Sequence, residues 1–331
     1  MCIRDRGIRA KFSSPISFTN VDKKDLESKN LGQDLPILLN FLPSVVTTSD
    51  AGAGIGYTGI RIRGVSPQST NITINGIPFN DPESMGTFWV NLPDFSSSIE
   101  SLQVQRGVGT STNGSGAFGA SINILTDIVS DEPFAELSSS FGSYNTLKNT
   151  IKFSTGKIND HFELSGRLSK IDSDGYVDRA YSDLKSYFIQ GAYTNGSTLI
   201  KAISFGGHEK TYQAWYGLSM VQVQENRRQN PYTYENEIDN YKQDHFQLHW
   251  NEKINNYWSF NLGLNYTDGR GYFEQYKEDD DINIYGGIVK SDIDSNGQET
   301  GTTDLIRRRW LDNDFYVLNS SINYIKDKID L

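Results

Sequence analysis

The sequence has one cysteine, Cys2, among 331 residues, which excludes a disulfide framework and a thiolate zinc cluster. It has no run of about 18 apolar residues, which excludes a transmembrane helix, and its mean hydropathy is −0.52. It has no excess of basic charge, because 31 Lys and Arg stand against 41 Asp and Glu for a formal net charge of −10. Nucleic acid is therefore not the expected partner. No nucleophile–base–orienter set stands out, so we expect no enzymatic activity, no cofactor and no metal site.

Low hydropathy still allows a β-barrel, because a barrel strand turns an apolar side chain toward lipid only at every second residue. From Ala135 onward the sequence alternates in this way. In residues 257–267, the apolar positions are Trp258, Phe260, Leu262, Leu264 and Tyr266. Aromatic residues make up 12% of the chain, which is high for a chain this polar, and the aromatic girdles of a barrel are one physical reason for it. The pattern predicts about eight antiparallel strands of roughly 8–12 residues, a length that crosses a bilayer.

The connections between these strands alternate in length as well. Short connections are expected at residues 156–160, 195–196, 253–256 and 326–328, and long ones at 172–183, 207–241 and 269–311, with a brief one at 142–145. Outer-membrane barrels have short periplasmic turns and long external loops, so the alternation predicts sidedness. A soluble β-sandwich or propeller also alternates and stays open as an alternative.

The first 126 residues have a different texture, with two glycine-anchored stretches at residues 59–78 and 99–126. We expect short helices after Asp22 and after Asp34, and strands near residues 45–48, 60–63, 71–74, 102–106 and 121–126. Asn75-Gly76 predicts a tight turn, because both residues tolerate positive φ. This part is predicted to be a small α+β domain ahead of the barrel strands.

The two stretches resemble the TonB-dependent outer-membrane receptors. The motifs that carry the resemblance are Arg63-Gly64, Asn75-Gly76, Arg106-Gly107 and the strand Ile122-Asn123-Ile124-Leu125-Thr126. Ala120-Ser121 departs from the paired glycines that are more common in the family. The resemblance implies a plug domain at residues 12–128 and the N-terminal part of a 22-stranded barrel at 134–331, so that the sheet stays open around the plug.

Residues 1–11 are expected to be a non-native or flexible leader. Residues 1–6 (MCIRDR) lack the apolar stretch of a secretory signal and look like translated sequencing-adapter sequence. With about eight strands, the chain is predicted to be a truncated piece of a longer receptor.

The resemblance also implies the function. Receptors of this family sit in the outer membrane of Gram-negative bacteria, bind a small nutrient complex and import it with energy from the TonB protein. A ferric siderophore or a similar iron chelate is the expected ligand, with oligosaccharide or cobalamin as alternatives. A passive β-barrel channel or adhesin is the alternative from another class, although a passive pore needs no domain that fills its lumen.

In the family, arginines at the positions of Arg63 and Arg106 form buried ion pairs with barrel glutamates, which would latch the plug. We expect these partners to lie past Leu331, so that both arginines lack them here. A solvated edge arginine is the plainer alternative.

Ligand contacts are expected from the plug apex and the long loops. The candidates are Tyr57, Phe79, Trp89, Tyr212, Trp215, Tyr216, Arg227 and Arg228. Aromatic faces with two arginines suit an anionic, partly aromatic chelate, although girdle or loop packing would explain the aromatics equally well. A TonB contact by β-augmentation is assigned to Pro15, Ile16, Ser17 and Phe18, with an ordinary edge strand as the alternative.

Three further patterns are set aside. His245 and His249 lie in a predicted strand, about 13 Å apart by strand rise, which is too far for one metal ion. Residues 292–297 match the first half of a calcium loop, but its twelfth position would be Thr303, so a polar turn is expected. Residues 114–119 echo a GxGxxG spacing, yet a strand follows, so no helix dipole would hold a phosphate.

Overall fold

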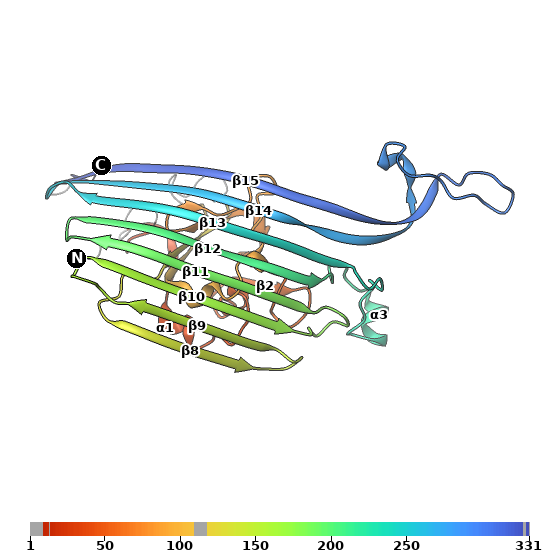
Figure 1. Ribbon diagram of the computed structural model, residues 1–331, viewed down its shortest axis with the longest axis horizontal. Coiled ribbons are helices and arrows are strands. Elements are labelled where there is room, and N and C mark those ends of the chain that lie inside the picture. Colours follow the sequence, from red (N-terminus) through yellow and green to blue (C-terminus); the bar gives the residue numbers. More distant parts are fainter. Residues whose placement is uncertain (1–8, 13, 109–117, 327–328, 331) are drawn as a thin grey trace.

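The computed structural model describes residues 9–12, 14–108, 118–326 and 329–330 in two parts (Figure 1). An N-terminal unit of short elements lies against one face of a large open sheet. Residues 1–8 of the expected leader at 1–11, most of the glycine-rich loop at 107–119 and the turn at 327–328 lie outside the described residues.

The N-terminal unit is built on a five-stranded sheet in the order β1-β6-β7-β4-β5. Its strands are β1 (Ser17–Asp22), β4 (Thr70–Ile74), β5 (Ile77–Pro78), β6 (Ile99–Arg106) and β7 (Ala120–Thr126). Strands β4 and β7 pair in parallel and the other neighbours pair antiparallel. Asn75 and Gly76 join β4 to β5 with φ of 54° and 82°, which confirms the predicted tight turn.

Short elements cover this sheet. They are helices α1 (Lys23–Glu27) and α2 (Leu35–Leu38), the hairpin β2 (Val45–Ser49) and β3 (Thr58–Ile62), and the 3-10 turns η1 (Pro67–Ser69), η2 (Trp89–Asn91) and η3 (Phe95–Ser98). Their apolar residues form one core with the sheet, which includes Leu26, Leu39, Ile62, Ile122 and Trp89. The core also takes in Phe188 and Phe205 from the large sheet, so the two parts are packed together rather than merely adjacent.

The large sheet has eight long antiparallel strands in sequence order, followed by the two-residue β16 (Ile329–Asp330). They are β8 (Pro133–Phe141), β9 (Leu147–Thr155), β10 (Phe162–Ser173), β11 (Ser182–Thr194), β12 (Thr198–Tyr212), β13 (Ile238–Lys253), β14 (Trp258–Asp281) and β15 (Thr302–Lys326). Strand β8 has 9 residues and β15 has 25, so β14 and β15 project beyond the others (Figure 1). The sheet does not close on itself, because β8 and β16 are its two edges.

The two faces of this sheet differ as the alternation predicts. The face against the N-terminal unit buries polar side chains such as Arg167, Gln190 and Gln247, whereas the opposite face exposes apolar ones such as Leu168, Ile189 and Phe246. The connections carry the helix α3 (Met220–Glu225) and the 3-10 turn η5 (Ile282–Tyr285) on the long-loop side. The predicted α+β domain followed by about eight antiparallel barrel-type strands is confirmed. No helix within the described residues has the length and apolar character that a membrane crossing requires.

Candidate functional site

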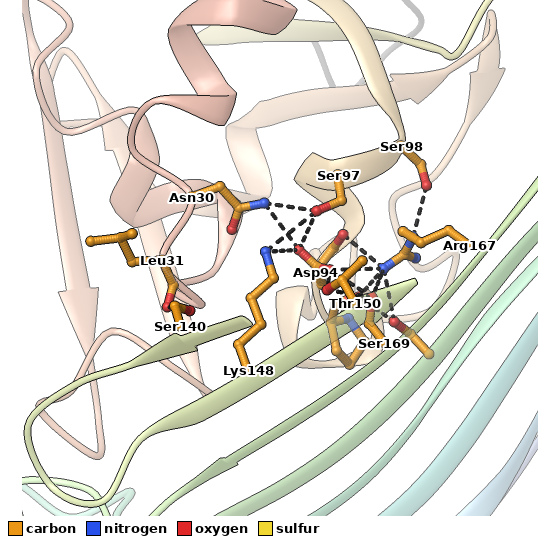
Figure 2. A network of polar contacts seen from close by, with 12 residues as sticks. Asn30, Leu31, Asp94, Ser97, Ser98, Ser140, Lys148, Thr150, Arg167 and Ser169 are labelled. Carbon is orange, nitrogen blue, oxygen red and sulfur yellow. Dashed lines mark hydrogen bonds and ion pairs between the residues drawn. The ribbon is translucent and has the colours of Figure 1, made fainter. Parts of the chain in front are cut away.

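The N-terminal unit is fastened to strands β9 and β10 through a buried group of charges around Asp94 (Figure 2). Lys148 Nζ lies 2.7 Å from Asp94 Oδ1, and Arg167 Nη1 lies 3.4 Å from Asp94 Oδ2. The hydroxyls of Thr150 and Ser169 donate to Oδ2 at 2.7 and 2.6 Å. We call these five residues the Asp94 cluster. One carboxylate thus receives two cations from two neighbouring strands, and none of the three charged side chains is more than 2% exposed.

The local backbone explains how Asp94 reaches this position. It precedes η3 in the left-handed region, with φ of 51°, a conformation that aspartate tolerates better than most residues. Arg167 also donates to the carbonyl of Asp94 at 2.9 Å and to Ser98 Oγ at 2.8 Å, so its fork is satisfied by the same turn. Burial alone would raise the pKa of Asp94, but Arg167 and Lys148 reverse this and hold the pKa well below its usual range.

A second junction on the same side involves Asp127, just after β7. Its carboxylate lies 3.0 Å from Lys23 Nζ and 2.7 Å from Lys152 Nζ of β9, and its carbonyl accepts from Lys201 of β12. Both charged junctions therefore use an aspartate of the N-terminal unit and lysine or arginine of the sheet. The latch predicted from the sequence has arginines on the plug and carboxylates on the barrel, so the charges at these two junctions are reversed.

Arg63 and Arg106 lie next to each other, but neither forms an ion pair with a carboxylate among the residues that the structure describes. Arg106 is 8% exposed and donates to the carbonyl of Pro43 at 3.1 Å and to Thr19 Oγ1 at 2.8 Å. Burial, and then the charge of Arg63, lowers the pKa of Arg106. Arg63 is exposed, with φ of 55°. Their role as latches stays a prediction.

Toward the long loops, the junction with β12 and β13 is acidic. The Tyr57 hydroxyl donates to the carboxylate of Asp239, while Glu209 is 1% exposed and accepts from Thr211 Oγ1. Asp34, which is 2% exposed, accepts from Thr58 Oγ1 at 3.0 Å. We call Asp34, Tyr57, Glu209 and Asp239 the Tyr57 cluster. No lysine or arginine among the described residues pairs with its carboxylates.

The electrostatics of the Tyr57 cluster follow from this lack of cations. Burial raises the pKa of Asp34 well above its ordinary value, against the smaller effect of its hydrogen bond from Thr58. Burial also raises the pKa of Tyr57, and the charges of Glu209 and Asp239 add to that rise. A space of about 10 Å³ lies beside Tyr57, among Ser182, Thr211, Trp215 and others, which is too small for anything larger than water.

Above Tyr57, aromatic rings lead from the N-terminal unit to the projecting strands. Tyr57 meets Trp215 edge-on at 5.2 Å between ring centroids, and Trp215 meets Phe273 of β14 at 5.6 Å. The guanidinium of Arg309 on β15 lies 5.9 Å from the Phe273 ring. We call these four residues the aromatic row. Arg309 is exposed, and no ion pair joins it to a carboxylate within the described part of the chain.

The other aromatic candidates lie in different settings. Phe79 packs on the core and meets His245 at 5.2 Å, and Trp89 is 3% exposed inside the core, which gives both a packing role in this conformation. Tyr212 is 5% exposed and its hydroxyl donates to the carbonyl of Tyr234. Tyr216 is 59% exposed on the long loop, so it remains accessible to a ligand.

The two loop arginines also differ. Arg228 donates from Nε to the carbonyl of Tyr176 at 2.9 Å and lies 3.4 Å from Asp178, so it ties the loop to the β10–β11 connection. Arg227 is exposed, and among the described residues it forms no ion pair. Sequence reasoning missed Phe273, Arg309, Lys148 and Arg167. The sequence did carry one signal for them: all four occupy strand positions that alternate onto the inner face of the sheet.

The proposed TonB contact lies at an edge. Ser17 and Phe18 are in β1, which pairs with β6 and forms one edge of the five-stranded sheet, and Pro15 and Ile16 precede it. An edge strand keeps one row of backbone groups open to a partner strand. The assignment stays a prediction.

The patterns set aside have ordinary structural roles. His245 and His249 are buried on the inner face of β13; His245 stacks on Phe205 at 4.6 Å and bonds to Thr267, and His249 bonds to Gln247. Asp294 closes a turn by accepting from the backbone of Asn296 and Gln298 at 2.8 Å each. One side-chain oxygen of that aspartate, Oδ1, thus caps a polar loop.

Comparison with known proteins gives matches that cover different parts of the chain. Residues 10–121 match the sequence model of the TonB-dependent Receptor Plug Domain family. Over 122 residues the chain is 31% identical to the probable TonB-dependent siderophore receptor PirA of Acinetobacter baumannii, covering 34% of this chain and 16% of that protein. Over 160 residues it is 29% identical to the vitamin B12 transporter BtuB of Vibrio vulnificus, covering 48% and 25%.

Solved structures show the same fold over nearly the whole chain. The siderophore receptor PirA from Acinetobacter baumannii aligns with a TM-score of 0.65 at 17% identity, over 95% of this chain and 46% of that one. The open form of the ferric-catecholate import receptor Fiu from E. coli K12 aligns with a TM-score of 0.69 at 15% identity, over 94% and 46%. The chain thus spans less than half of the solved chains and a quarter or less of the curated relatives.

Proposed function

The chain belongs to the TonB-dependent receptors, and from that premise we propose that it serves as a bacterial outer-membrane receptor for a scarce nutrient complex. The proposed cargo is a ferric siderophore or a similar iron chelate, and the proposed energy source is the TonB protein. The N-terminal unit would act as the plug, with proposed bounds of residues 12–128, and residues 134–331 would form part of the barrel wall.

The observation that carries the choice of ligand is the aromatic row. Its rings run from the plug apex at Tyr57 through Trp215 to Phe273, and Arg309 lies over the last ring with its charge exposed. Ring faces bind planar aromatic groups, and a guanidinium binds an anionic oxygen pair as a fork. An iron chelate with aromatic arms and net negative charge has both features, so it would bridge the barrel strands and the plug.

Import of cobalamin is the second candidate, favoured by the similarity to the Vibrio vulnificus vitamin B12 transporter. Aromatic faces would also stack on a corrin ring. The exposed guanidinium of Arg309 distinguishes the two ligands, because it serves an anionic chelate better than a bulky neutral cobalamin.

The test uses cells that express the gene for this chain, with radiolabelled ferric enterobactin and radiolabelled cobalamin as probes. We expect saturable iron uptake, with the half-saturating concentration raised about tenfold by Arg309→Ala, which equals about 1.4 kcal/mol of lost binding. Lys290→Ala, an exposed residue of the β14–β15 loop, is the matched control and leaves uptake unchanged. Uptake of cobalamin without uptake of iron would overturn the iron-chelate proposal and favour cobalamin as the ligand.

The loop arginines give a second measurement on the same cells. Growth on candidate iron chelates should fall when Arg227→Ala and Arg228→Ala are combined. Because Arg228 holds the loop to Tyr176 and Asp178, the single Arg227→Ala variant separates ligand binding from loop order. Unchanged growth of both variants would remove the long loop from the proposed ligand site.

A further inference from the structure

A row of basic residues crosses the outer face of the large sheet, the face turned away from the plug. Strand pairing places Lys170 opposite Lys185, Lys185 opposite His208, His208 opposite Lys242, and Lys242 opposite Arg270. Five consecutive strands, β10 to β14, thus present a basic side chain at the same level. Neighbouring strands lie about 4.8 Å apart, and like charges directly opposite each other are destabilising, so such a row requires counter-charges.

Acidic residues supply those counter-charges at the two ends of the row. Lys170 pairs with Asp172 and Asp183, Lys242 pairs with Asp244 at 2.6 Å, and Arg270 lies within 3.1 Å of three aspartates. These last three are Asp268, Asp312 and Asp314. The ends of the row are therefore neutralised by the protein itself.

The middle of the row is not neutralised. Lys185 and Lys210 are exposed, and neither forms an ion pair with a carboxylate in the described part of the chain. Lys210 lies two residues beyond His208 along β12, opposite Asp183, which is already engaged by Lys170. The surface at β11 and β12 thus keeps two uncompensated ammonium groups around His208.

Directly below this point, toward the short turns, the outer face has an apolar groove of about 870 Å³. Its floor on β11 and β12 is made of small residues, Gly191, Ala202 and Ser204, and its walls include Ile189, Phe246 and Leu248. The small residues pair with the bulky ones across strands, since Ser204 lies opposite Ile189 and Phe246. The groove is therefore a depression that crosses the apolar band from β11 to β15, and its edge at Ser204 lies four residues along β12 from His208.

Tyr187 marks the boundary between the groove and the charges. It lies between Lys185 and Ile189 on β11, and its hydroxyl donates to Asp244 Oδ1 at 2.9 Å. Tyrosine is enriched at this depth of membrane proteins because its ring is apolar and its hydroxyl is polar. The groove below Tyr187 accordingly lies at acyl-chain depth and Lys185 and Lys210 at headgroup depth.

We propose that this groove and the uncompensated lysines form a binding site for one anionic, phosphate-bearing lipid on the long-loop side of the membrane. Its acyl chain would occupy the groove over Ala202 and Ser204, and its phosphate would bind Lys185, Lys210 and His208. The site rests on the proposed membrane location but not on the imported ligand, so uptake measurements and lipid binding fail independently.

The test is native mass spectrometry of the full chain in a neutral detergent, titrated with dimyristoylphosphatidylglycerol or dimyristoylphosphatidylcholine. The two lipids share acyl chains and differ in net charge. We expect one retained phosphatidylglycerol at a concentration at least tenfold lower than phosphatidylcholine requires. The double variant Lys185→Gln/Lys210→Gln should weaken phosphatidylglycerol binding about tenfold or more, because each lysine near an anionic headgroup contributes to the attraction.

Three controls decide the interpretation. Lys277→Gln/Lys290→Gln removes the same charge from the β14–β15 projection and should leave binding unchanged. Lys185→Arg/Lys210→Arg should restore binding, which excludes misfolding as the cause of a loss. Ala202→Phe keeps the charges but fills the groove and should also reduce retention. Equal retention of the two lipids, wild-type binding by the Lys→Gln pair, or displacement of the lipid by millimolar inorganic phosphate alone would overturn the proposal.

Discussion

Two of the buried junctions between the plug and the sheet, the Asp94 cluster and the Tyr57 cluster, use opposite electrostatic arrangements. At the Asp94 cluster, one plug carboxylate is surrounded by Lys148 and Arg167 of β9 and β10. At the Tyr57 cluster, buried carboxyls from the plug and from β12 and β13 meet around the phenol of Tyr57. No lysine or arginine among the described residues forms an ion pair with them. A compensated buried charge resists separation, because parting it leaves ions unpaired in a low dielectric. An uncompensated acidic group favours separation or protonation.

This difference predicts which side of the plug stays attached to the sheet and which side separates from it first. The Asp94 cluster and Asp127 hold the plug to β9 and β10. Apart from the bond from Lys201 of β12 to the Asp127 carbonyl, the contacts described on the other side are neutral or acidic. Asn75 to Gln247 at 3.3 Å and Asn319 to the carbonyl of Gly76 at 3.1 Å are examples of the neutral kind. We expect the plug to open first at β12 and β13, beneath the aromatic row.

The largest expected effect is the loss of the compensated carboxylate. Asp94→Ala leaves Lys148 and Arg167 buried without their partner, which should reduce the free energy of opening around η3 by about 3–5 kcal/mol. Amide hydrogen exchange resolved by residue measures this locally. Asp304→Ala, an exposed carboxylate on β15, is the control and should leave η3 unchanged.

A combined replacement tests whether the charge or the packing carries the effect. Replacing Asp94 by Leu together with Lys148→Met and Arg167→Met removes all three charges, and such apolar substitutions of buried ion groups are often close to neutral. Protection near wild type is therefore expected. If the triple variant opens as readily as Asp94→Ala, hydrogen-bond geometry rather than charge balance holds this side.

The pH response should have opposite signs at the two junctions. The pKa of Asp94 is lowered, so its stabilisation is present above its unfolded value near 3.9 and is lost as pH falls below it. The pKa of Asp34 is raised by burial, so its contribution is present below about 3.9 and is lost as pH rises toward the folded value. Exchange around Thr58 should therefore speed up as pH rises above about 3.9, after correction for intrinsic rates, while Ser97 and Ser98 stay protected. Equal responses would remove the distinction.

Removing one charge from the acidic side should stabilise it. Asp239→Asn keeps an oxygen that accepts from the Tyr57 hydroxyl but removes a negative charge beside Glu209. Protection of Tyr57 and Thr58 at pH 8 should rise by about 1 kcal/mol, since one unit of pKa shift corresponds to about that energy. Tyr57→Phe is the companion variant. It keeps the charge and loses the hydrogen bond, so protection should fall.

Sequence alone carried the fold much further than the site. Alternation over residues such as Trp258, Phe260 and Leu262 and the Asn75-Gly76 turn are local signals, and each correctly placed a strand or a turn. The Asp94 cluster joins residues 54 and 73 positions apart, so it depends on how the plug is oriented against β9 and β10. The alternation of side chains along β9 and β10 could identify Lys148 and Arg167 as cations on the inner face of the sheet. It could not identify Asp94 as the aspartate that they contact.

The smallest expected effect is at Arg106. This buried cation has no carboxylate partner among the described residues, so it tests whether an unpaired charge also stabilises the plug. Arg106→Met loses its bonds to Pro43 and Thr19, each a net contribution of roughly 1 kcal/mol, but it also removes a charge that burial and Arg63 disfavour. These terms oppose each other, so protection of β1 and β6 should change by less than about 1 kcal/mol. Arg63→Met, at an exposed position, is the control. If Arg106→Met instead lowers the free energy of opening at β1 and β6 by about 3 kcal/mol or more, an arginine without a carboxylate stabilises the plug as strongly as Asp94 does. Charge compensation would then no longer explain the difference between the Asp94 and Tyr57 junctions.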